Sequence, residues 1–247
     1  MTSHRHISLA KTTDKETNER LTILIPAAGM GRRMKSYGPK CLLDIGGITI
    51  LERQIKILLK IYPGSDIIVI SGFESDKVRK KIKAKYPVRI INNHRYKETN
   101  VLYSISLGLQ ASINRDFLIV YGDLVFSSKL IKGMCDEKSK VLIDKAGMFR
   151  KDEVGVTHNI NEITNFSYGL NDKWSQIAYI TGKELELFEA AAFNEDCEKW
   201  FGYEALNFVI NNGGKLAHVS TEGSKIVEVD SVKDIAKAIR VHYVSRV

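Results

Sequence analysis

Strand-like and helix-like stretches alternate along the first half of this chain. Leu21 to Ile25 is an apolar run rich in β-branched residues, which is typical of a buried parallel strand. Thr49 to Ile61 carries apolar side chains at helical spacing with charged ones opposite, which predicts a helix packed on a sheet. Further strands are expected at 66–70, 88–91 and 117–121, and further helices at 74–85 and 100–113. This alternation predicts an α/β fold with a doubly wound sheet.

The pattern changes after residue 141. Short strand-like pieces follow at 141–144, 146–149, 160–166 and 175–180. They predict a small antiparallel β insertion, about 141–180, that covers the crevice of the sheet. Beyond it we expect helices at 184–193 and 203–212, strands at 215–219 and 225–229, and a closing helix from Ser231. Thr181 with Glu184, and Ser231 with Asp234, have the spacing of capping boxes.

The composition is that of a globular protein, because 44% of the 247 residues are hydrophobic and 27% are charged. Residues 1–20 are polar and are expected to form a flexible tail ahead of one domain at 21–247. No run approaches the roughly 18 apolar residues of a membrane span, so we expect a cytoplasmic protein with no membrane partner. The three cysteines lie far apart, with neither zinc spacing nor an even count for a disulfide framework.

The net charge of +8 is consistent with more than one kind of partner. It would suit a nucleic acid, but it suits equally an enzyme whose substrates are all phosphorylated. The chain has no basic stripe interleaved with aromatic residues and no nucleic-acid motif. We therefore expect no nucleic-acid partner.

The stretch from Pro26 to Lys40 carries the most informative chemistry. It leaves the first strand as Pro-Ala-Ala-Gly-Met-Gly-Arg-Arg-Met and continues to Gly-Pro-Lys. Small residues at the carboxyl end of a strand let backbone N–H groups approach an anion, and open α/β sheets bind ligands at that edge. Arg33 and Lys40 can then neutralise a triphosphate. Gly29 and Gly31 alone would not establish this, since loop glycines also serve tight turns.

The whole pattern, Ala-Ala-Gly-x-Gly-x-Arg-Met followed by Pro-Lys-x-Leu, resembles the signature of the nucleotidylyltransferases of the NTP transferase or MobA-like superfamily. Within that group, Tyr96 to Leu107 looks most like the branch of choline-phosphate and aminoalkylphosphonate cytidylyltransferases. The resemblance implies a Rossmann-like, GT-A-like mixed sheet. It also implies Mg²⁺-dependent transfer of a nucleoside monophosphate, CMP from CTP, to a small phosphorylated or phosphonylated acceptor, with release of pyrophosphate.

The resemblance also implies catalytic and metal-binding roles. Arg33 would hold the β- and γ-phosphates of the leaving group, and Lys40 would reach the α-phosphate. Asp123 and Asp230 each end a predicted strand and would hold the Mg²⁺. A turn residue and a helix cap, respectively, are the alternative interpretations of these two carboxylates.

The implied nucleotide-binding residues are Ala27, Ala28, Gly29, Met30, Gly31, Arg32, Asn100 and Ser104. Asn100 and Ser104 could instead be a helix cap and a packed small residue. Many sugar-specific members have a Gly-rich segment near this point, whereas this chain has Lys97 to Asn100, and that difference favours a cytidylyltransferase.

A cationic acceptor such as phosphocholine would require an aromatic face or a carboxylate. The candidate acceptor-binding residues are Tyr168, Trp174, Tyr179 and Tyr203, each of which could instead serve only for packing.

Three other functions remain open. A sugar-1-phosphate acceptor is the nearest alternative. A metal-dependent glycosyltransferase would share the sheet and a metal-binding Asp, but it would have no triphosphate for Arg33 and Lys40 to hold. A non-catalytic nucleotide-binding regulator would not need Lys40, Asp123 and Asp230 together. The oligomeric state also stays open, with a homodimer as one option.

Overall fold

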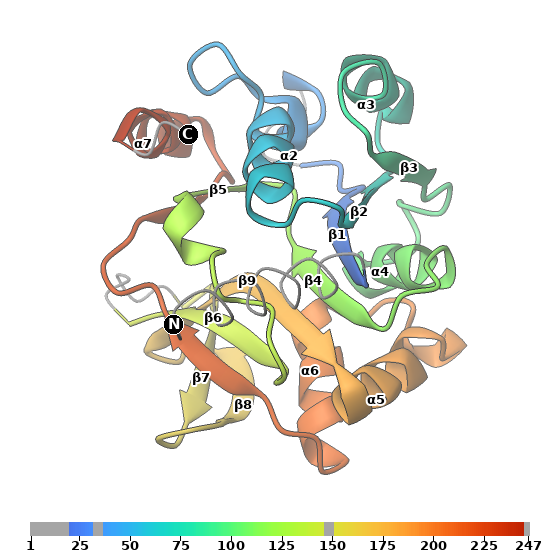
Figure 1. The fold of residues 1–247 in the computed structure, drawn as a ribbon, viewed down its shortest axis with the longest axis vertical. Coiled ribbons are helices and arrows are strands. Elements are labelled where there is room, and N and C mark those ends of the chain that lie inside the picture. The colour runs from blue at the N-terminus through green and yellow to red at the C-terminus, as the bar shows by residue number, and fades with distance from the viewer. Residues whose placement is uncertain (1–19, 32–36, 146–150, 245–247) are drawn as a thin grey trace, which may run out of the picture.

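The computed structural model describes residues 20–31, 37–145 and 151–244, and its strands confirm the expected α/β architecture. The strands of the main sheet are β1 (Leu21–Ala27), β2 (Asp66–Ser71), β3 (Arg89–Asn92), β4 (Asp116–Val120), β6 (Lys140–Asp144), β7 (Val154–His158), β8 (Ile163–Tyr168), β9 (Asp172–Thr181) and β10 (Ala217–Ser220). Their main path runs β10-β6-β9-β4-β1-β2-β3 (Figure 1). A separate antiparallel pair consists of β5 (Leu124–Phe126) and β11 (Ile226–Glu228).

The centre of the main sheet is parallel and one side of it is antiparallel. Strands β4, β1, β2 and β3 pair in parallel, whereas β9 runs antiparallel between β4 and β6. Antiparallel strands are thus present in the region expected to be an insertion. However, β6 and β9 belong to the main path of the sheet, and β7 and β8 form a hairpin that branches from it at β9. The hairpin strand β7 was not expected, β8 begins three residues later than expected, and the strand expected at 146–149 lies outside the described residues.

Helices cover both faces of this sheet. The described helices are α2 (Ile50–Ile61), α3 (Ser75–Ile82), α4 (Val101–Gln110), α5 (Gly182–Ala192), α6 (Gly202–Asn211) and α7 (Val232–Val244). Along β1, the fully buried Ile23 and Ile25 pack with α2 and α3, whereas Leu24 between them packs with α4. In Figure 1, α2 accordingly lies above the central strands and α5 and α6 lie below them. A strand buried on both faces explains the continuous apolar run at the start of the chain.

The predicted capping boxes had different outcomes. At the start of α7, the Asp234 carboxylate accepts a hydrogen bond from Ser231 N–H at 3.0 Å, which is half of a box. At the start of α5 the prediction was wrong. The Thr181 hydroxyl donates to Asp116 on the neighbouring strand, and Glu184 accepts from Lys215 N–H at 3.0 Å. Both side chains of the predicted box therefore hydrogen-bond residues that are distant in the sequence instead of capping α5.

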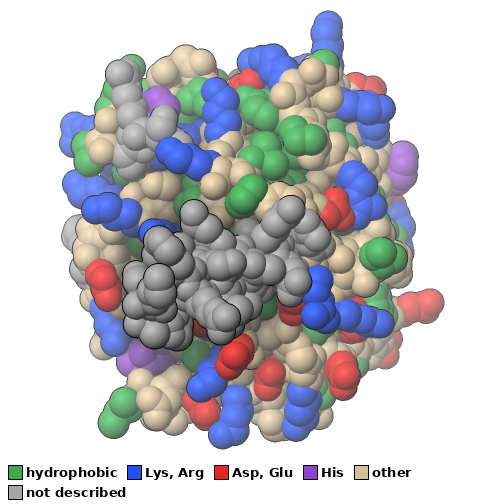
Figure 2. Space-filling view, viewed as in Figure 1, with side chains coloured by type: hydrophobic (Ala, Val, Ile, Leu, Met, Phe, Trp, Pro, Cys, Tyr) green, Lys and Arg blue, Asp and Glu red, His purple; other side chains and the backbone are tan. Residues whose placement is uncertain are grey.

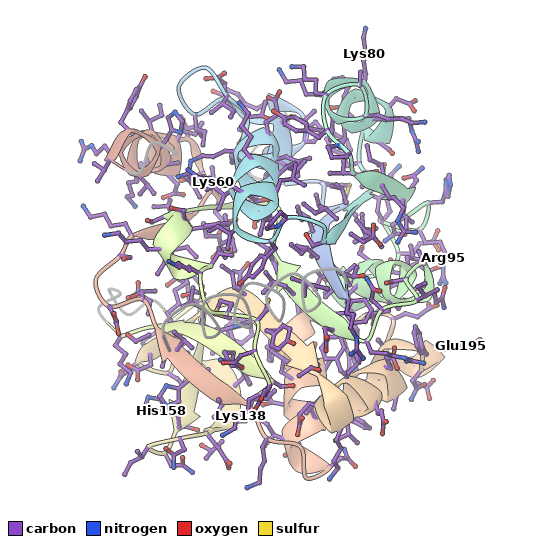
Figure 3. All side chains as sticks on the ribbon, viewed as in Figure 1. Lys60, Lys80, Arg95, Lys138, His158 and Glu195 are labelled. Carbon is purple, nitrogen blue, oxygen red and sulfur yellow. The ribbon has the colours of Figure 1, made fainter. Side chains whose placement is uncertain are left out.

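Charged side chains spread over the visible surface. In the view of Figure 2, Lys and Arg alternate with Asp and Glu and do not gather into one stripe. Lys60, Lys80 and Lys138 are exposed, and Lys80 lies at the upper edge of the view in Figure 3. Across the described residues, no helix combines the length and apolar character that crossing a membrane requires.

Replacing Gly108 with Ala should destabilise the protein, although alanine favours helices. A Cβ atom at this position of α4 would lie 2.8 Å from Leu24 Cδ2 and 3.2 Å from Ile70 Cδ1. Overpacking costs about 1–3 kcal/mol, whereas Ala gains roughly 1 kcal/mol over Gly in a helix. Because a 2.8 Å contact puts the cost in the upper part of that range, about 2–3 kcal/mol, we expect Gly108→Ala to lower the free energy of unfolding in urea by about 1–2 kcal/mol. Gln110→Ala, at an exposed position of the same helix, should change it by less than about 0.5 kcal/mol. Equal midpoints for the two variants would contradict the close packing.

Candidate functional site

A cavity of about 490 Å³ opens at the carboxyl ends of β1 and β4. Its lining includes twelve of the site residues predicted from the sequence, namely Ala27, Ala28, Gly29, Gly31, Lys40, Asn100, Ser104, Asp123, Tyr168, Trp174, Tyr203 and Asp230. These residues come from segments spread over 200 positions of the chain, and the fold brings them to one place. A cavity of this size is in the usual range for a nucleotide-sized ligand.

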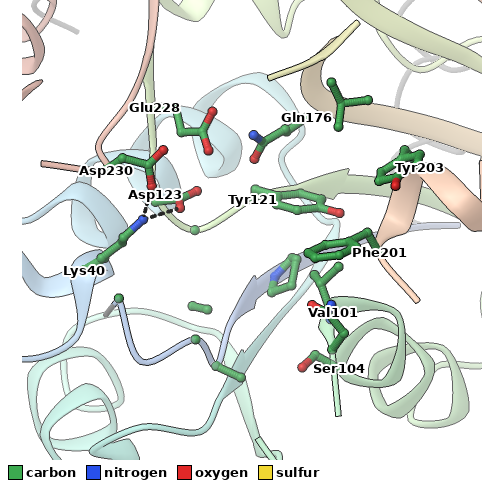
Figure 4. A pocket seen from close by; sticks show the side chains of 18 of the residues that line it. Lys40, Val101, Ser104, Tyr121, Asp123, Gln176, Phe201, Tyr203, Glu228 and Asp230 are labelled. Atoms are coloured by element: carbon green, nitrogen blue, oxygen red, sulfur yellow. Dashed lines mark hydrogen bonds and ion pairs between the residues drawn. The ribbon is translucent and has the colours of Figure 1, made fainter. Parts of the chain in front are cut away.

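Lys40 lies between the two predicted metal-binding carboxylates. Its Nζ atom is 3.4 Å from Asp123 Oδ2 and forms a short contact with Asp230 Oδ1 (Figure 4). Burial alone lowers the pKa of Lys40, but the two carboxylates outweigh it and the net effect is a raised pKa. Lys40 is therefore a protonated cation at neutral pH, held at the charged end of the cavity.

The β5 and β11 ladder brings these two aspartates together. Glu228 lies opposite Leu124 in this antiparallel pair, and Val229 N–H donates to Asp123 C=O at 3.0 Å. Gly122, just before Asp123, lies so close to the end of β1 that a Cβ there would be 2.7 Å from Ala27 Cβ. The turn after β4 is thus pressed against β1 on one side and bonded to β11 on the other.

The phosphate loop predicted after β1 lies directly against Lys40. Gly31 has φ +52°, and a Cβ there would be 2.8 Å from Lys40 Cγ. The backbone N–H groups of Gly29, Met30 and Gly31 donate to no acceptor in the described part of the chain. Unpaired N–H groups beside a lysine form the kind of environment that binds phosphate.

Glu228 is a third carboxylate at this end, and our sequence reasoning missed it. Carboxylate oxygens of Asp123, Glu228 and Asp230 lie within 4.8 Å of one another and could hold a metal ion. Burial and the nearby Asp123 raise the pKa of Glu228 to about 7. A signal was present in the sequence, because Glu228 and Asp230 are two residues apart at the end of a strand and so lie on one face.

Two further residues were missed on the other side of Glu228. Lys173 Nζ lies 3.2 Å from Glu228 Oε2 and 2.8 Å from Glu153 Oε1. Gln176 adopts the left-handed φ of +57°, which is costly for a residue other than glycine, and its side chain hydrogen-bonds Glu228. The register shift between β6 and β9 lies beside it, and no local sequence pattern announced this irregularity.

Asn100 and Ser104 differ in how much of their side chains is free for a ligand. Asn100 caps α4, with Oδ1 accepting from Val101 N–H at 2.8 Å and Nδ2 donating to Lys199 C=O at 3.3 Å. The expected cap is therefore present, and the Asn100 amide is largely occupied. Ser104 lies one turn further on, with its hydroxyl at the cavity wall.

The candidate acceptor-binding residues separate into surface and core positions. Tyr168 and Tyr203 pack edge to face with ring centroids 5.6 Å apart, and Phe201, which was not predicted, stacks on Tyr203. Trp174 reaches the cavity wall but is only 4% exposed. Tyr179 must be removed from the set, because it is 1% exposed and packs in the core against the α2 face of the sheet.

The remaining predicted residues do not line the cavity or cannot be placed. Met30 is not among its lining residues, and Arg32 and Arg33 lie outside the described residues. Cys41 does line it, but burial raises the pKa of its thiol to about 12. A protonated thiol is neither a nucleophile nor a metal ligand at neutral pH.

A family model described as the MobA-like NTP transferase domain matches residues 23–151. Among known proteins, the bifunctional protein GlmU of Solibacter usitatus is 34% identical over 103 residues. That segment is 42% of this chain and only 22% of the relative.

Solved structures extend the similarity to most of the chain. CTP:phosphocholine cytidylyltransferase from Streptococcus pneumoniae superposes with a TM-score of 0.75 at 21% identity, covering 90% of this chain and 99% of that one. The inositol-1-phosphate CTP transferase from T. maritima gives 0.73 at 19% identity, covering 91% and 95%. At these identities the likeness shows a shared fold.

Glu228→Gln should weaken the binding of a divalent cation. The substitution keeps the shape of the side chain but removes one of three clustered anionic ligands, so we expect affinity for Mn²⁺ to fall by about tenfold or more. Calorimetric titration measures this directly. Glu153→Gln is the matched control, since Glu153 also contacts Lys173 but does not belong to the three-carboxylate cluster. Equal Mn²⁺ affinity in the two variants would exclude Glu228 from the metal site.

Proposed function

This chain belongs to the family of MobA-like NTP transferase domains, and from that membership we propose that it transfers CMP from CTP to a small phosphorylated or phosphonylated acceptor and releases pyrophosphate. The observation that carries this proposal is the position of Lys40. It joins Asp123 and Asp230 beside the N–H groups of Gly29 to Gly31, which have no acceptor among the residues that the structure describes. A glycosyltransferase would have no triphosphate for this loop and lysine to bind.

The carboxylate cluster fits a hard divalent cation such as Mg²⁺. All three side chains offer oxygen ligands, which Mg²⁺ prefers. Asp123 Oδ1 is buried and has no hydrogen-bond partner among the described residues, so one ligand oxygen is available. When bound, the metal would neutralise charge on the phosphates.

The chain's own groups would position the reactants and stabilise charge. An oxygen of the acceptor attacks the α-phosphorus of CTP, a new P–O bond forms, and the bond to the β-phosphate oxygen breaks as pyrophosphate leaves. Backbone N–H groups of Gly29 and Gly31 would hold phosphate oxygens, and Lys40 would neutralise the α-phosphate. Arg33 is proposed from the sequence to hold the leaving pyrophosphate. Such pre-positioned cations supply most of the acceleration that this reaction needs.

The other end of the cavity suits a cationic acceptor. Tyr168 and Phe201 are 47% and 45% exposed, so their aromatic surfaces are available, and Tyr203 joins them. Glu153 also lines the cavity, and its neighbour Val154 pairs with Tyr168 in the hairpin. Aromatic faces near carboxylates bind quaternary or primary ammonium groups by cation–π and charge attraction. We therefore favour phosphocholine or an aminoalkylphosphonate as the acceptor.

Lys40→Ala should lower turnover by two to three orders of magnitude. Loss of a charge that acts on the transition state commonly costs about 3–4 kcal/mol. Arg33→Ala should have a similar effect if it holds the leaving group. Steady-state release of pyrophosphate measures both, with Lys60→Ala as an exposed control and thermal melting as the check on folding. Near-wild-type turnover of a folded Lys40→Ala protein would overturn the proposed mechanism.

A screen of pyrophosphate release tests the reaction itself. It crosses CTP, UTP, GTP, ATP and dTTP with phosphocholine, aminoethylphosphonate and sugar-1-phosphates. We expect the fastest reaction with CTP and an amine-bearing acceptor, because the segment Tyr96 to Leu107 resembles the cytidylyltransferase branch and the cavity combines aromatic and acidic groups. Excess chelator should abolish it.

Each result of the screen has a definite meaning. Preference for UTP or dTTP with a sugar-1-phosphate would replace the cytidylyl proposal with a nucleotide-sugar activity. Full activity in chelator would overturn the role of Asp123 and Asp230 as metal ligands. Absence of release with every pair would favour a nucleotide-binding regulator.

A further inference from the structure

Asn93, which our sequence reasoning did not single out, is held rigidly at the carboxyl end of β3. Its side chain is buried, with the residue 1% exposed, and its backbone N–H donates to Ser71 C=O at 2.7 Å. Its Oδ1 atom accepts from Arg95 N–H at 2.9 Å. Because a backbone N–H can only donate, this contact fixes which end of the Asn93 amide is oxygen.

The Asn93 amide nitrogen is consequently turned toward two hydroxyls. Nδ2 donates to Ser104 Oγ at 3.0 Å and to Thr99 Oγ1 at 3.3 Å. The Thr99 hydroxyl in turn donates a hydrogen bond to Arg95 C=O at 2.9 Å. Thr99 is thereby satisfied within the loop.

The Ser104 hydroxyl can still donate a hydrogen bond. Its oxygen accepts from Asn93, and no acceptor in the described part of the chain takes the Ser104 hydroxyl hydrogen. Ser106, on the same helix and equally buried, differs because it donates to Tyr103 C=O at 2.9 Å. Since Ser104 lines the cavity, a ligand can accept a hydrogen bond from its hydroxyl.

The position of Ser104 indicates which part of the ligand it meets. Figure 4 shows it well apart from Lys40, and thus away from the phosphate end. Asn93 follows β3, on one side of β1 in the sheet order, whereas β9 and the hairpin that carries Tyr168 lie on the other. If the phosphates of a nucleotide lie over β1, its base therefore extends toward Ser104, and the acceptor lies on the side of Tyr168.

The resemblance described above implies that Ser104 binds the nucleotide. We propose that Asn93 is a positioning residue that keeps the Ser104 hydroxyl as a hydrogen-bond donor toward an acceptor atom of the pyrimidine base, either O2 or N3. The inference rests on the proposed function and adds to it a residue that acts through Ser104. A site with a directed donor discriminates against bases that leave the donor unpaired.

Calorimetric titrations of CTP with Mg²⁺, without acceptor, test the role of Ser104. Ser104→Ala should weaken CTP binding about tenfold, the effect of one lost hydrogen bond, while Ser106→Ala should leave it unchanged. The analogues 3-deaza-CTP and 2-thio-CTP alter N3 and O2, respectively. The analogue that lacks the acceptor should bind wild type and Ser104→Ala equally, which identifies the atom. If wild type binds both analogues about tenfold more tightly than Ser104→Ala does, the Ser104 hydroxyl does not bind O2 or N3 of the base, and the inference is overturned.

A double-mutant cycle tests whether Asn93 acts through Ser104. Asn93→Asp replaces the donating amide with an acceptor that attracts the Ser104 proton away from the cavity, so it should also weaken CTP binding about tenfold. In the Ser104→Ala background it should cost nothing more, whereas additive losses would overturn the positioning role. If melting shows that the carboxylate unfolds the protein, Asn93→Ser must give the same non-additive loss. Asn114→Asp, which removes an amide donor to Thr22 outside the cavity, is the control.

The same data separate this inference from the proposed function. Equal CTP affinity of wild type and Ser104→Ala would overturn only the inference. Failure of the wild type to bind any triphosphate would overturn the proposed function, and the inference with it.

Discussion

The contact of Lys40 with Asp123 and Asp230 is the interaction on which the site depends. It joins three segments that are up to 190 positions apart and holds a protonated amine at the carboxyl edge of the sheet. The backbone is built to keep this contact. Gly31 and Gly122 allow close approach on one side, and the β5–β11 ladder ties Asp123 to the segment before Asp230 on the other. Several unrelated parts of the fold thus converge on one charged group.

Among the described residues around this contact, acidic side chains outnumber basic ones. Asp123, Glu228 and Asp230 form one cluster, in which Lys40 contacts the two aspartates and Lys173 contacts Glu228 and also Glu153. Burial makes like charges costly, which is why the pKa values of Asp123 and Glu228 are raised. Buried carboxylates that ionise unfavourably beside one another are stabilised by a bound cation, and shifted pKa values of this kind are typical of functional sites.

The sheet order arranges three chemistries along the cavity. Hydrogen-bonding groups lie at the end of β3 (Asn93) and on α4 (Ser104), the groups proposed to bind phosphate lie at β1 and β4, and Tyr168 lies on the hairpin beyond β9. The antiparallel strand β9 makes this arrangement possible. It continues the sheet past β4, and it pairs with β7 of the hairpin that carries Tyr168. A nucleotide and its acceptor could therefore lie in line over the central strands.

Local patterns in the sequence determined the elements and the residues with strong local signals. The apolar run of β1, the helical spacing of α2 and the turn from Ala27 to Gly31 each depend on neighbours in the chain, so the sequence predicted them directly. Tertiary structure decided the rest, because long-range partners outweighed local preference. Thr181 left its cap for Asp116, Tyr179 was buried by the sheet, and Glu228 and Asn93 acquired their roles only from partners that folding brought to them.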